Sequence, residues 1–182
     1  MIYLLRHGQT DWNKAGRMQG QTDIPLNQTG IEAAYRAVDF VLQKKITSIY
    51  SSDLLRAKQT AEIINSYLNV SLNFDERLRE IAYGDIEGKL KEEITTKMWV
   101  LFNEMPEKIK AESFERIYDR VKSFFSELDP KENVMIVTHA GFIRMALYFN
   151  QHKKSFNLNE YKEFQHLKIE NTTLIPLDAE GH

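Results

Sequence analysis

The chain has 182 residues, with 24 Lys and Arg against 26 Asp and Glu, five His and no Cys, for a formal net charge of -2. The lack of Cys excludes a disulfide framework, a thiolate zinc site and a cysteine nucleophile. Acidic and basic residues are interleaved, and no stretch approaches the ~20 apolar residues of a membrane span. We therefore expect one cytoplasmic domain over residues 1–182, with no nucleic-acid or membrane partner, and a homodimer stays open.

Short apolar runs alternate with amphipathic segments along most of the chain. The pattern predicts strands at residues 2–5, 46–50, 70–74, 134–137 and 167–177, and helices at residues 30–42, 114–128 and 142–149. A further helix is expected after the polar run Ser51–Asp53, which offers capping side chains, with Arg56 in its first turn. Strands that alternate with helices predict a three-layer α/β/α sandwich with a mostly parallel sheet.

Residues 82–110 break this alternation with glycines, a proline and several Lys and Glu. We expect them to form a cap, an excursion over the sheet, and not a second domain. The spacing of Met98, Trp99, Phe102 and Met105 fits an apolar wall facing a substrate and fits ordinary helix packing equally well.

Two of the predicted strands end in similar polar residues. Arg6 and His7 follow the first strand, and His139 follows residues 134–137. Ligands of open α/β sheets bind outside the carboxyl ends of the strands, so both histidines are expected at one edge, within reach of Arg56. Two guanidinium groups and two imidazoles near helix termini suit a tetrahedral phosphate dianion. The pattern alone does not establish that residues so distant in sequence converge.

Five sequence blocks add to this pattern: Leu5–Asn13, Gly16–Gly30, Ser51–Ala61, Leu78–Gly88 and Thr138–Arg144. In this order they resemble the histidine phosphatase superfamily, which includes the cofactor-dependent phosphoglycerate mutases. An Arg-His-Gly triplet alone would be a weak signal, whereas the ordered set covers about residues 1–150 and is specific. The resemblance implies a phosphoglycerate mutase-like fold.

The resemblance also implies hydrolysis of a small-molecule phosphate monoester through a phosphohistidine, with neither a metal nor a cofactor. His7 would be the nucleophile, with one ring nitrogen unprotonated and the proton of the other held by an acceptor such as a backbone carbonyl. Glu80 would protonate the leaving oxygen and then take a proton from water. A shifted alignment of this block would select an acidic neighbour instead, Glu76, Asp85 or Glu87.

A phosphate-binding set is implied around these two residues. Arg6, Arg56 and His139 would bind phosphate oxygens and stabilise the charge of the transition state, and Asn13 and Gln19 would add neutral donors. Outside the family context each residue has a structural alternative, such as a histidine at a strand end, an arginine in a surface ion pair or a polar loop side chain. The five blocks together favour the phosphate site.

The superfamily contains mutases, phosphatases and proteins that bind phosphate with little turnover. Its mutases usually carry a longer insertion with arginines for the substrate carboxylate, and this chain has no Arg between Arg79 and Arg116. A phosphatase is therefore expected. The Thr138–Gly141 sequence and the chain length resemble α-ribazole-5'-phosphate phosphatases of cobalamin biosynthesis, although phosphoserine and sugar-phosphate phosphatases fit almost as well. Phosphoglycerate mutase activity and phosphate binding with little turnover remain the alternatives.

Three departures from the family pattern bear on the substrate and not on turnover. Ala140 replaces a glycine that many members have, Ile86 stands where an aromatic residue is common, and residues 110–113 lack the usual preceding Pro-Gly-Gly. Ser113 is expected to be able to face the pocket, without a catalytic role.

Overall fold

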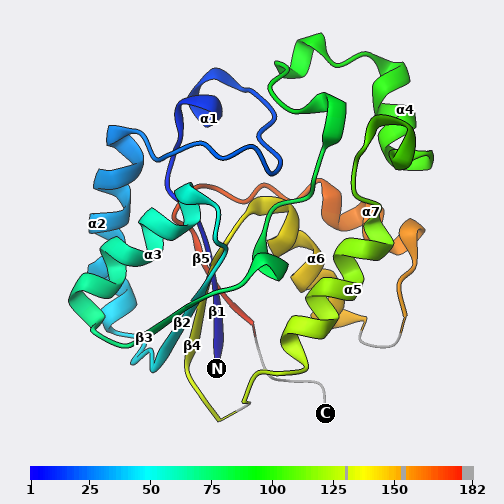
Figure 1. Ribbon diagram of the computed structural model, residues 1–182. Helices are drawn as coiled ribbons and strands as arrows, with labels where there is room; N and C mark the ends of the chain where they lie inside the picture. The colour runs from blue at the N-terminus through cyan, green and yellow to red at the C-terminus, as the bar shows by residue number, and fades with distance from the viewer. Residues whose placement is uncertain (130, 153–154, 178–182) are drawn as a thin grey trace.

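The computed structural model describes residues 1–129, 131–152 and 155–177 (Figure 1). A five-stranded sheet has the order β3-β2-β4-β1-β5, with β1 (Ile2–Arg6), β2 (Ser48–Ser51), β3 (Ser71–Phe74), β4 (Val134–Thr138) and β5 (Leu174–Leu177). Strands β1 to β4 pair in parallel, and only β5 runs antiparallel, against β1. The predicted mostly parallel sheet is confirmed.

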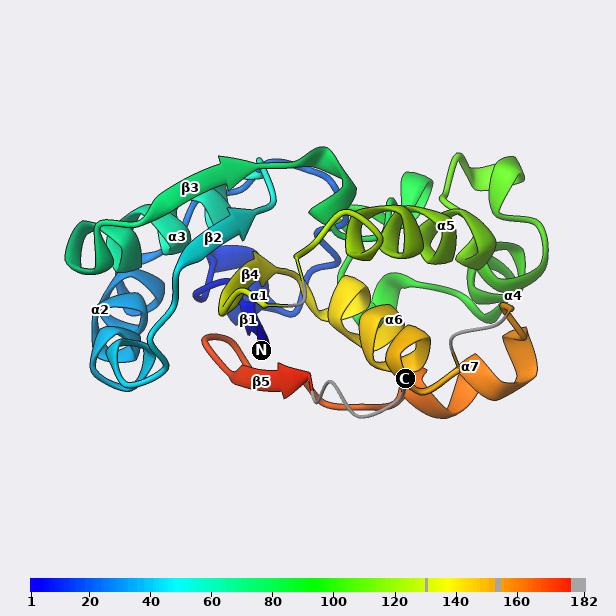
Figure 2. The same cartoon turned by 90° about the horizontal axis from the view of Figure 1, so that it is seen from below.

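Helices cover both faces of this sheet, and others lie at its edge. The α-helices of the described residues are α1 (Asp11–Ala15), α2 (Gln28–Leu42), α3 (Leu55–Leu68), α4 (Thr96–Glu104), α5 (Phe114–Phe125), α6 (Ala140–Gln151) and α7 (Leu158–Gln165). Figure 2 shows the sheet between α2 and α3 on one side and α5 and α6 on the other. The molecule is the predicted three-layer α/β/α sandwich.

The continuous apolar runs follow from burial of both faces of the sheet. Leu4 and Ile136 pack into the core cluster that includes α5 and α6, whereas Leu5 and Val137 pack into the cluster under α2 and α3. All four side chains are inaccessible to solvent. Successive strand residues point to opposite faces, so a strand covered on both faces is apolar throughout instead of alternating.

The start of α3 differs from the sequence prediction. Ser51–Asp53 do not cap this helix through a side chain at its N-cap position; instead the N–H of Leu55 donates to Asp23 Oδ1 at 2.6 Å. The carboxylate of Asp53 pairs with Arg79. Ion pairing gives Asp53 a charge-assisted partner, and the helix N-terminus takes its carboxylate from a distant loop.

Other differences concern element boundaries near the carboxyl end. The strand expected at residues 167–177 is ordered as β only over Leu174–Leu177, and α5 ends at Phe125 instead of residue 128. The helix α7 was not predicted, because only Tyr161 on it is buried and the apolar period is therefore weak. None of the helices in the described ranges combines the length and the apolarity needed to cross a membrane.

The carboxyl ends of the parallel strands meet at the upper edge of the sheet in Figure 1, between α1 and the segment that contains α4. This segment, residues 82–110, consists of short 3₁₀ helices η2 (Gly84–Ile86), η3 (Lys91–Glu93) and η4 (Pro106–Ile109) around α4. It lies beside the edge to which the sequence assigns the phosphate site.

Candidate active site

A cavity of about 830 Å³ opens at this edge of the sheet. Six of the residues singled out from the sequence line it: Arg6, His7, Asn13, Gln19, Arg56 and Glu80. They come from segments that are up to 74 positions apart, from residue 6 to residue 80. The convergence that the sequence pattern left open is therefore present in the fold.

His7 directly follows β1 and is 2% exposed. Its Nδ1 lies 2.7 Å from the carbonyl oxygen of Gly8, and because a carbonyl can only accept, Nδ1 carries the proton. Nε2 is then the ring nitrogen with a lone pair. Burial, and after it the positive charges of Arg56 and Arg6, hold the pKa of His7 well below its ordinary value, so the ring is neutral.

His139 is the N-cap residue of α6 and is fully buried beside His7, with ring centroids 5.1 Å apart. Arg56 Nε donates to His139 Nδ1 at 3.2 Å, so the proton lies on Nε2, which donates to Ser52 Oγ at 2.9 Å. Burial first, and then Arg56, hold the pKa of His139 well below its ordinary value. Both ring nitrogens have protein partners, and His139 orients Arg56 without lining the cavity.

The two arginines are held mainly by backbone carbonyls. Arg56 donates from its terminal nitrogens to the carbonyl oxygens of Thr22 and Gly20, at 2.9 and 2.6 Å. With the bond to His139, described residues occupy three of its five N–H groups, which leaves two for a ligand. Burial lowers the pKa of Arg56 to about 10, so it remains charged at neutral pH.

Arg6, which also lines the cavity, makes a similar contact. Its Nη1 donates to the carbonyl of Ile169 at 2.5 Å, while its buried Nε has no hydrogen-bond partner among the described residues. A buried donor without a partner costs about 1–3 kcal/mol. A phosphate oxygen beside Arg6 would supply an acceptor.

The side-chain amides of Asn13 and Gln19 share one anchor. Thr10 Oγ1 lies 3.2 Å from Asn13 Oδ1 and 3.0 Å from Gln19 Oε1, in position to donate to either. Thr10 is the N-cap of α1, and it forms a capping box with Asn13. Because each amide turns its oxygen to Thr10, its NH₂ group points away from Thr10. This orientation leaves the NH₂ group able to donate a hydrogen bond to a phosphate oxygen.

The carboxyl group of Glu80 lies at the N-terminus of α6. Glu80 Oε1 accepts from the backbone N–H of Gly141 at 2.9 Å and from that of Ile81 at 3.0 Å. A Cβ at position 141 would come within 2.3 Å of Glu80 Oε1, so glycine is needed for this approach. The neighbouring acids of the block do not line the cavity, and the structure places Glu80 there.

Part of the cavity wall is aromatic. It is formed by a row of rings from separate segments, with neighbouring centroids 5.2–6.1 Å apart: Tyr83, Trp99, Phe102, Phe114 and Tyr161. Trp99 and Phe102 line the cavity and also pack in or against the core cluster, whereas Met98 packs against that cluster without lining the cavity. Both interpretations of this spacing therefore apply to Trp99 and Phe102, and ordinary packing alone applies to Met98.

Sequence reasoning missed several residues around the cavity. Ser52 holds His139, Asn171 Nδ2 donates to the carbonyl of His7 at 2.8 Å, and Arg17 and Arg144 add positive charge to the cavity wall. The polar run after a buried strand was a usable signal for Ser52. Arg144 lies in the second histidine block but was assigned no role.

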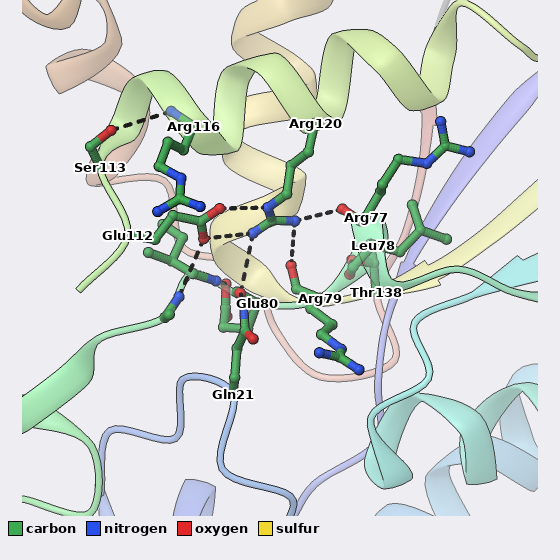
Figure 3. Close-up of polar contacts among 12 residues, drawn as sticks. Gln21, Arg77, Leu78, Arg79, Glu80, Glu112, Ser113, Arg116, Arg120 and Thr138 are labelled. Carbon is green, nitrogen blue, oxygen red and sulfur yellow. Dashed lines mark hydrogen bonds and ion pairs between the residues drawn. The ribbon is translucent and has the colours of Figure 1, made fainter. Parts of the chain in front are cut away.

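Ser113 does not line the cavity and instead caps α5, accepting from the N–H of Arg116 at 3.3 Å (Figure 3). Over the described ranges, no three His, Asp or Glu side chains are grouped closely enough to hold a metal ion.

Comparison with known proteins is consistent with this geometry. The sequence profile of the histidine phosphatase superfamily (branch 1) matches residues 2–182. A Hydrogenobacter thermophilus protein named "Putative phosphoserine phosphatase 2" is 32% identical over 200 residues, which cover 100% of this chain and 96% of that protein. The "Uncharacterized phosphatase PhoE" of Bacillus subtilis is 37% identical over 151 residues, covering 80% of this chain and 75% of that protein.

Among solved structures, the mycobacterial glucosyl-3-phosphoglycerate phosphatase in complex with VO3 aligns with a TM-score of 0.81 at 26% identity, over 95% of this chain and 88% of that chain. The matches confirm the expected phosphoglycerate mutase-like fold and the expected class of enzyme, a phosphatase. The chain belongs to the histidine phosphatase superfamily.

Proposed function

We propose that this protein hydrolyses phosphate monoesters through a phosphohistidine on His7, without a metal. The observation that carries the proposal is the hydrogen bond from His7 Nδ1 to the Gly8 carbonyl. This bond leaves Nε2 unprotonated, so its lone pair is available to attack phosphorus. Arg6 and Arg56 lie beside this ring and remain charged, so they can neutralise the phosphate oxygens.

In the first step, the Nε2 lone pair forms a bond to phosphorus while the bond from phosphorus to the leaving oxygen breaks. Glu80 gives its proton to that oxygen, and the alcohol leaves. In the second step, water attacks phosphorus and passes a proton to the Glu80 carboxylate, and the N–P bond breaks. The electron pair returns to Nε2, inorganic phosphate departs, and both side chains regain their starting state.

The aromatic row supports a substrate whose leaving group carries a flat or apolar part. A cavity of about 830 Å³ is far larger than a phosphate group needs, and Trp99 and Phe102 contribute rings to its wall. α-Ribazole 5'-phosphate, which carries a heteroaromatic base, fits this chemistry and is our first candidate substrate. Phosphoserine and sugar phosphates are the competing candidates, and we propose that the reaction takes place in the cytoplasm.

The test is phosphate release in EDTA from a panel of α-ribazole 5'-phosphate, phosphoserine, sugar phosphates, 3-phosphoglycerate and an aryl phosphate. The matched control is His7→Ala. A parallel sample of wild-type enzyme is quenched in base during turnover and examined by intact mass and peptide mapping for a phosphoryl group on His7.

Release that persists in EDTA, disappears in His7→Ala and is accompanied by phosphorylated His7 supports the proposal. A rate for α-ribazole 5'-phosphate well above the others identifies the substrate. Isomerisation of 3-phosphoglycerate that requires a bisphosphate primer would favour a mutase. Phosphate binding without release from any ester would favour a binding protein.

A further inference from the structure

The segment that carries Glu80 has an unusual support. Residues 79–83 run between the 3₁₀ helices η1 (Glu76–Leu78) and η2 and belong to no strand of the sheet, so the sheet does not position them. Their polar backbone groups are bound mostly by side chains (Figure 3). The largest share of these contacts goes to Arg120, on α5.

Arg120 binds two carbonyl groups of this segment and one of η1 just before it. Its Nη1 donates to the carbonyls of Arg77 and Arg79, at 2.6 and 2.7 Å, and its Nη2 donates to the carbonyl of Glu80 at 3.2 Å. The guanidinium group therefore supplies hydrogen-bond donors that a neighbouring strand would otherwise give to the backbone of this segment. The last of these contacts is on the backbone of the proposed acid itself.

Glu112 completes the support. It accepts from Arg120 Nε at 2.8 Å and from Arg120 Nη2 at 3.0 Å, so described residues engage all five N–H groups of the guanidinium. The two side chains are only 15% and 12% exposed. Glu112 also holds Ala82 directly, through the bond from Glu112 N–H to the Ala82 carbonyl at 2.8 Å.

The support lies outside the cavity and rests on the buried face of α5. Arg120 and Glu112 do not line the cavity, so they do not touch a substrate there. On α5, Ile117 and Val121 beside Arg120 are inaccessible to solvent, which fixes the helix against the core. From the other side, Gln21 Nε2 donates to the Glu80 carbonyl at 3.1 Å.

We propose that Arg120, oriented by Glu112, is a positioning residue that sets the place of the Glu80 carboxyl group relative to the leaving oxygen. The proposal rests on the proposed function of Glu80 as the acid. A planar guanidinium with five donors reaches three carbonyls and a carboxylate at once. A lysine ammonium carries three donors on one nitrogen and cannot span them, so charge alone does not replace Arg120.

The test compares Arg120→Lys and Glu112→Gln with wild type on an alkyl phosphate and on an aryl phosphate. A displaced acid costs most where the leaving oxygen needs a proton. We therefore expect kcat/KM, which reports the step that forms the phosphohistidine and not its later hydrolysis, to fall about 10- to 100-fold for the alkyl ester in Arg120→Lys. The aryl ester should lose about threefold or less, because a phenolate leaves with little protonation. Glu112→Gln should also lower the ratio of the alkyl rate to the aryl rate, by a smaller factor.

Arg116→Lys is the matched control, since Arg116 lies one turn earlier on α5 and is exposed. It should leave both rates unchanged. The double variant Glu80→Gln/Arg120→Lys should show the same alkyl-to-aryl ratio as Glu80→Gln alone, because a residue that acts through Glu80 has no effect once the acid is gone.

Equal losses on both esters in Arg120→Lys, or a ratio that changes further in the double variant, would overturn the proposal. If Arg120→Lys does not fold, the alkyl-to-aryl ratio is measured instead in Glu112→Gln and in Glu80→Gln/Glu112→Gln. The same outcomes then support or overturn the proposal. A normal ratio in Glu80→Gln itself would reject Glu80 as the acid, and the proposal with it. A changed ratio in Glu80→Gln with a normal one in Arg120→Lys would reject the positioning role alone.

Discussion

The two ends of the cavity are built in different ways. At the end that we propose for the phosphate group, His7 follows β1, Arg56 lies in the first turn of α3 and His139 precedes α6, so each side chain is placed by a strand or helix terminus. At the end that we propose for the leaving group, the aromatic row comes from Tyr83 just before η2 and from α4, α5 and α7, which belong to no sheet and are held by side-chain packing.

This difference indicates which end of the cavity controls turnover and which end controls substrate preference. The arginines and histidines at the phosphate end are hydrogen-bonded to one another or to backbone carbonyls. Replacing one of them would therefore break contacts at the ends of the strands. At the other end, Trp99 is partly exposed, so its ring can be exchanged without opening the core, whereas Phe102, Phe114 and Tyr161 are at most 5% exposed and belong to the core cluster. We therefore expect substitutions at the first end to abolish turnover, and substitutions at the second to change which ester is preferred.

The largest effect is expected from His7→Ala. Removing the nucleophile should lower kcat about 10⁴-fold or more on every ester, because the two-step route is lost. Phosphate release and circular dichroism are the measurements, with His152→Ala, a histidine away from the cavity, as the control. A folded His7→Ala enzyme with a wild-type rate would falsify the phosphohistidine route.

Glu80→Gln should have the second largest effect on the rate. It distinguishes protonation of the leaving group from binding of the phosphate group. Loss of the acid should slow alkyl esters about 100- to 1,000-fold and aryl esters far less. The measurement is kcat/KM on one ester of each kind, because kcat also contains the hydrolysis of the phosphohistidine, in which Glu80 acts on every ester alike. Equal losses on both would show that Glu80 does not protonate the leaving group.

Trp99→Ala tests the leaving-group end by itself. Losing the apolar contact of one ring, about 1–2 kcal/mol, should raise KM about 10-fold for an ester with an aromatic leaving group and leave glycerol phosphate nearly unaffected. Val100→Ala, at the exposed neighbouring position, is the control. A uniform rise in KM for both esters would place Trp99 outside the specificity wall.

The smallest effect concerns stability at the phosphate end. Burial, Arg56 and Arg6 hold the pKa of His7 well below its ordinary value. The unfolded chain binds this proton below about pH 6.5 and the folded chain does not, so acid favours unfolding. Between pH 7.5 and 5.5, wild type should lose about 1.4 kcal/mol more unfolding free energy than His7→Ala, measured by urea denaturation. Equal losses would contradict a neutral buried His7.

The sequence by itself determined the layered fold and placed Arg6, His7 and His139 at one edge of the sheet, while their convergence with Arg56 stayed open. Apolar strands followed by Arg6-His7 and by His139 are local patterns, and the carboxyl ends of parallel strands necessarily share one edge of a sheet. The position of Arg56 in the first turn of its helix follows from the same local pattern.

Only the tertiary structure decided the remaining features. That His139 orients Arg56 behind the cavity wall, that Asp53 pairs with Arg79 instead of capping α3, and that Glu80 rests on Arg120 all depend on contacts between distant segments. Hydrogen bonds and ring contacts of this kind leave no periodic pattern in the chain, because periodicity records only which face of an element is buried. The identity of the partner on that face is set when the segments pack.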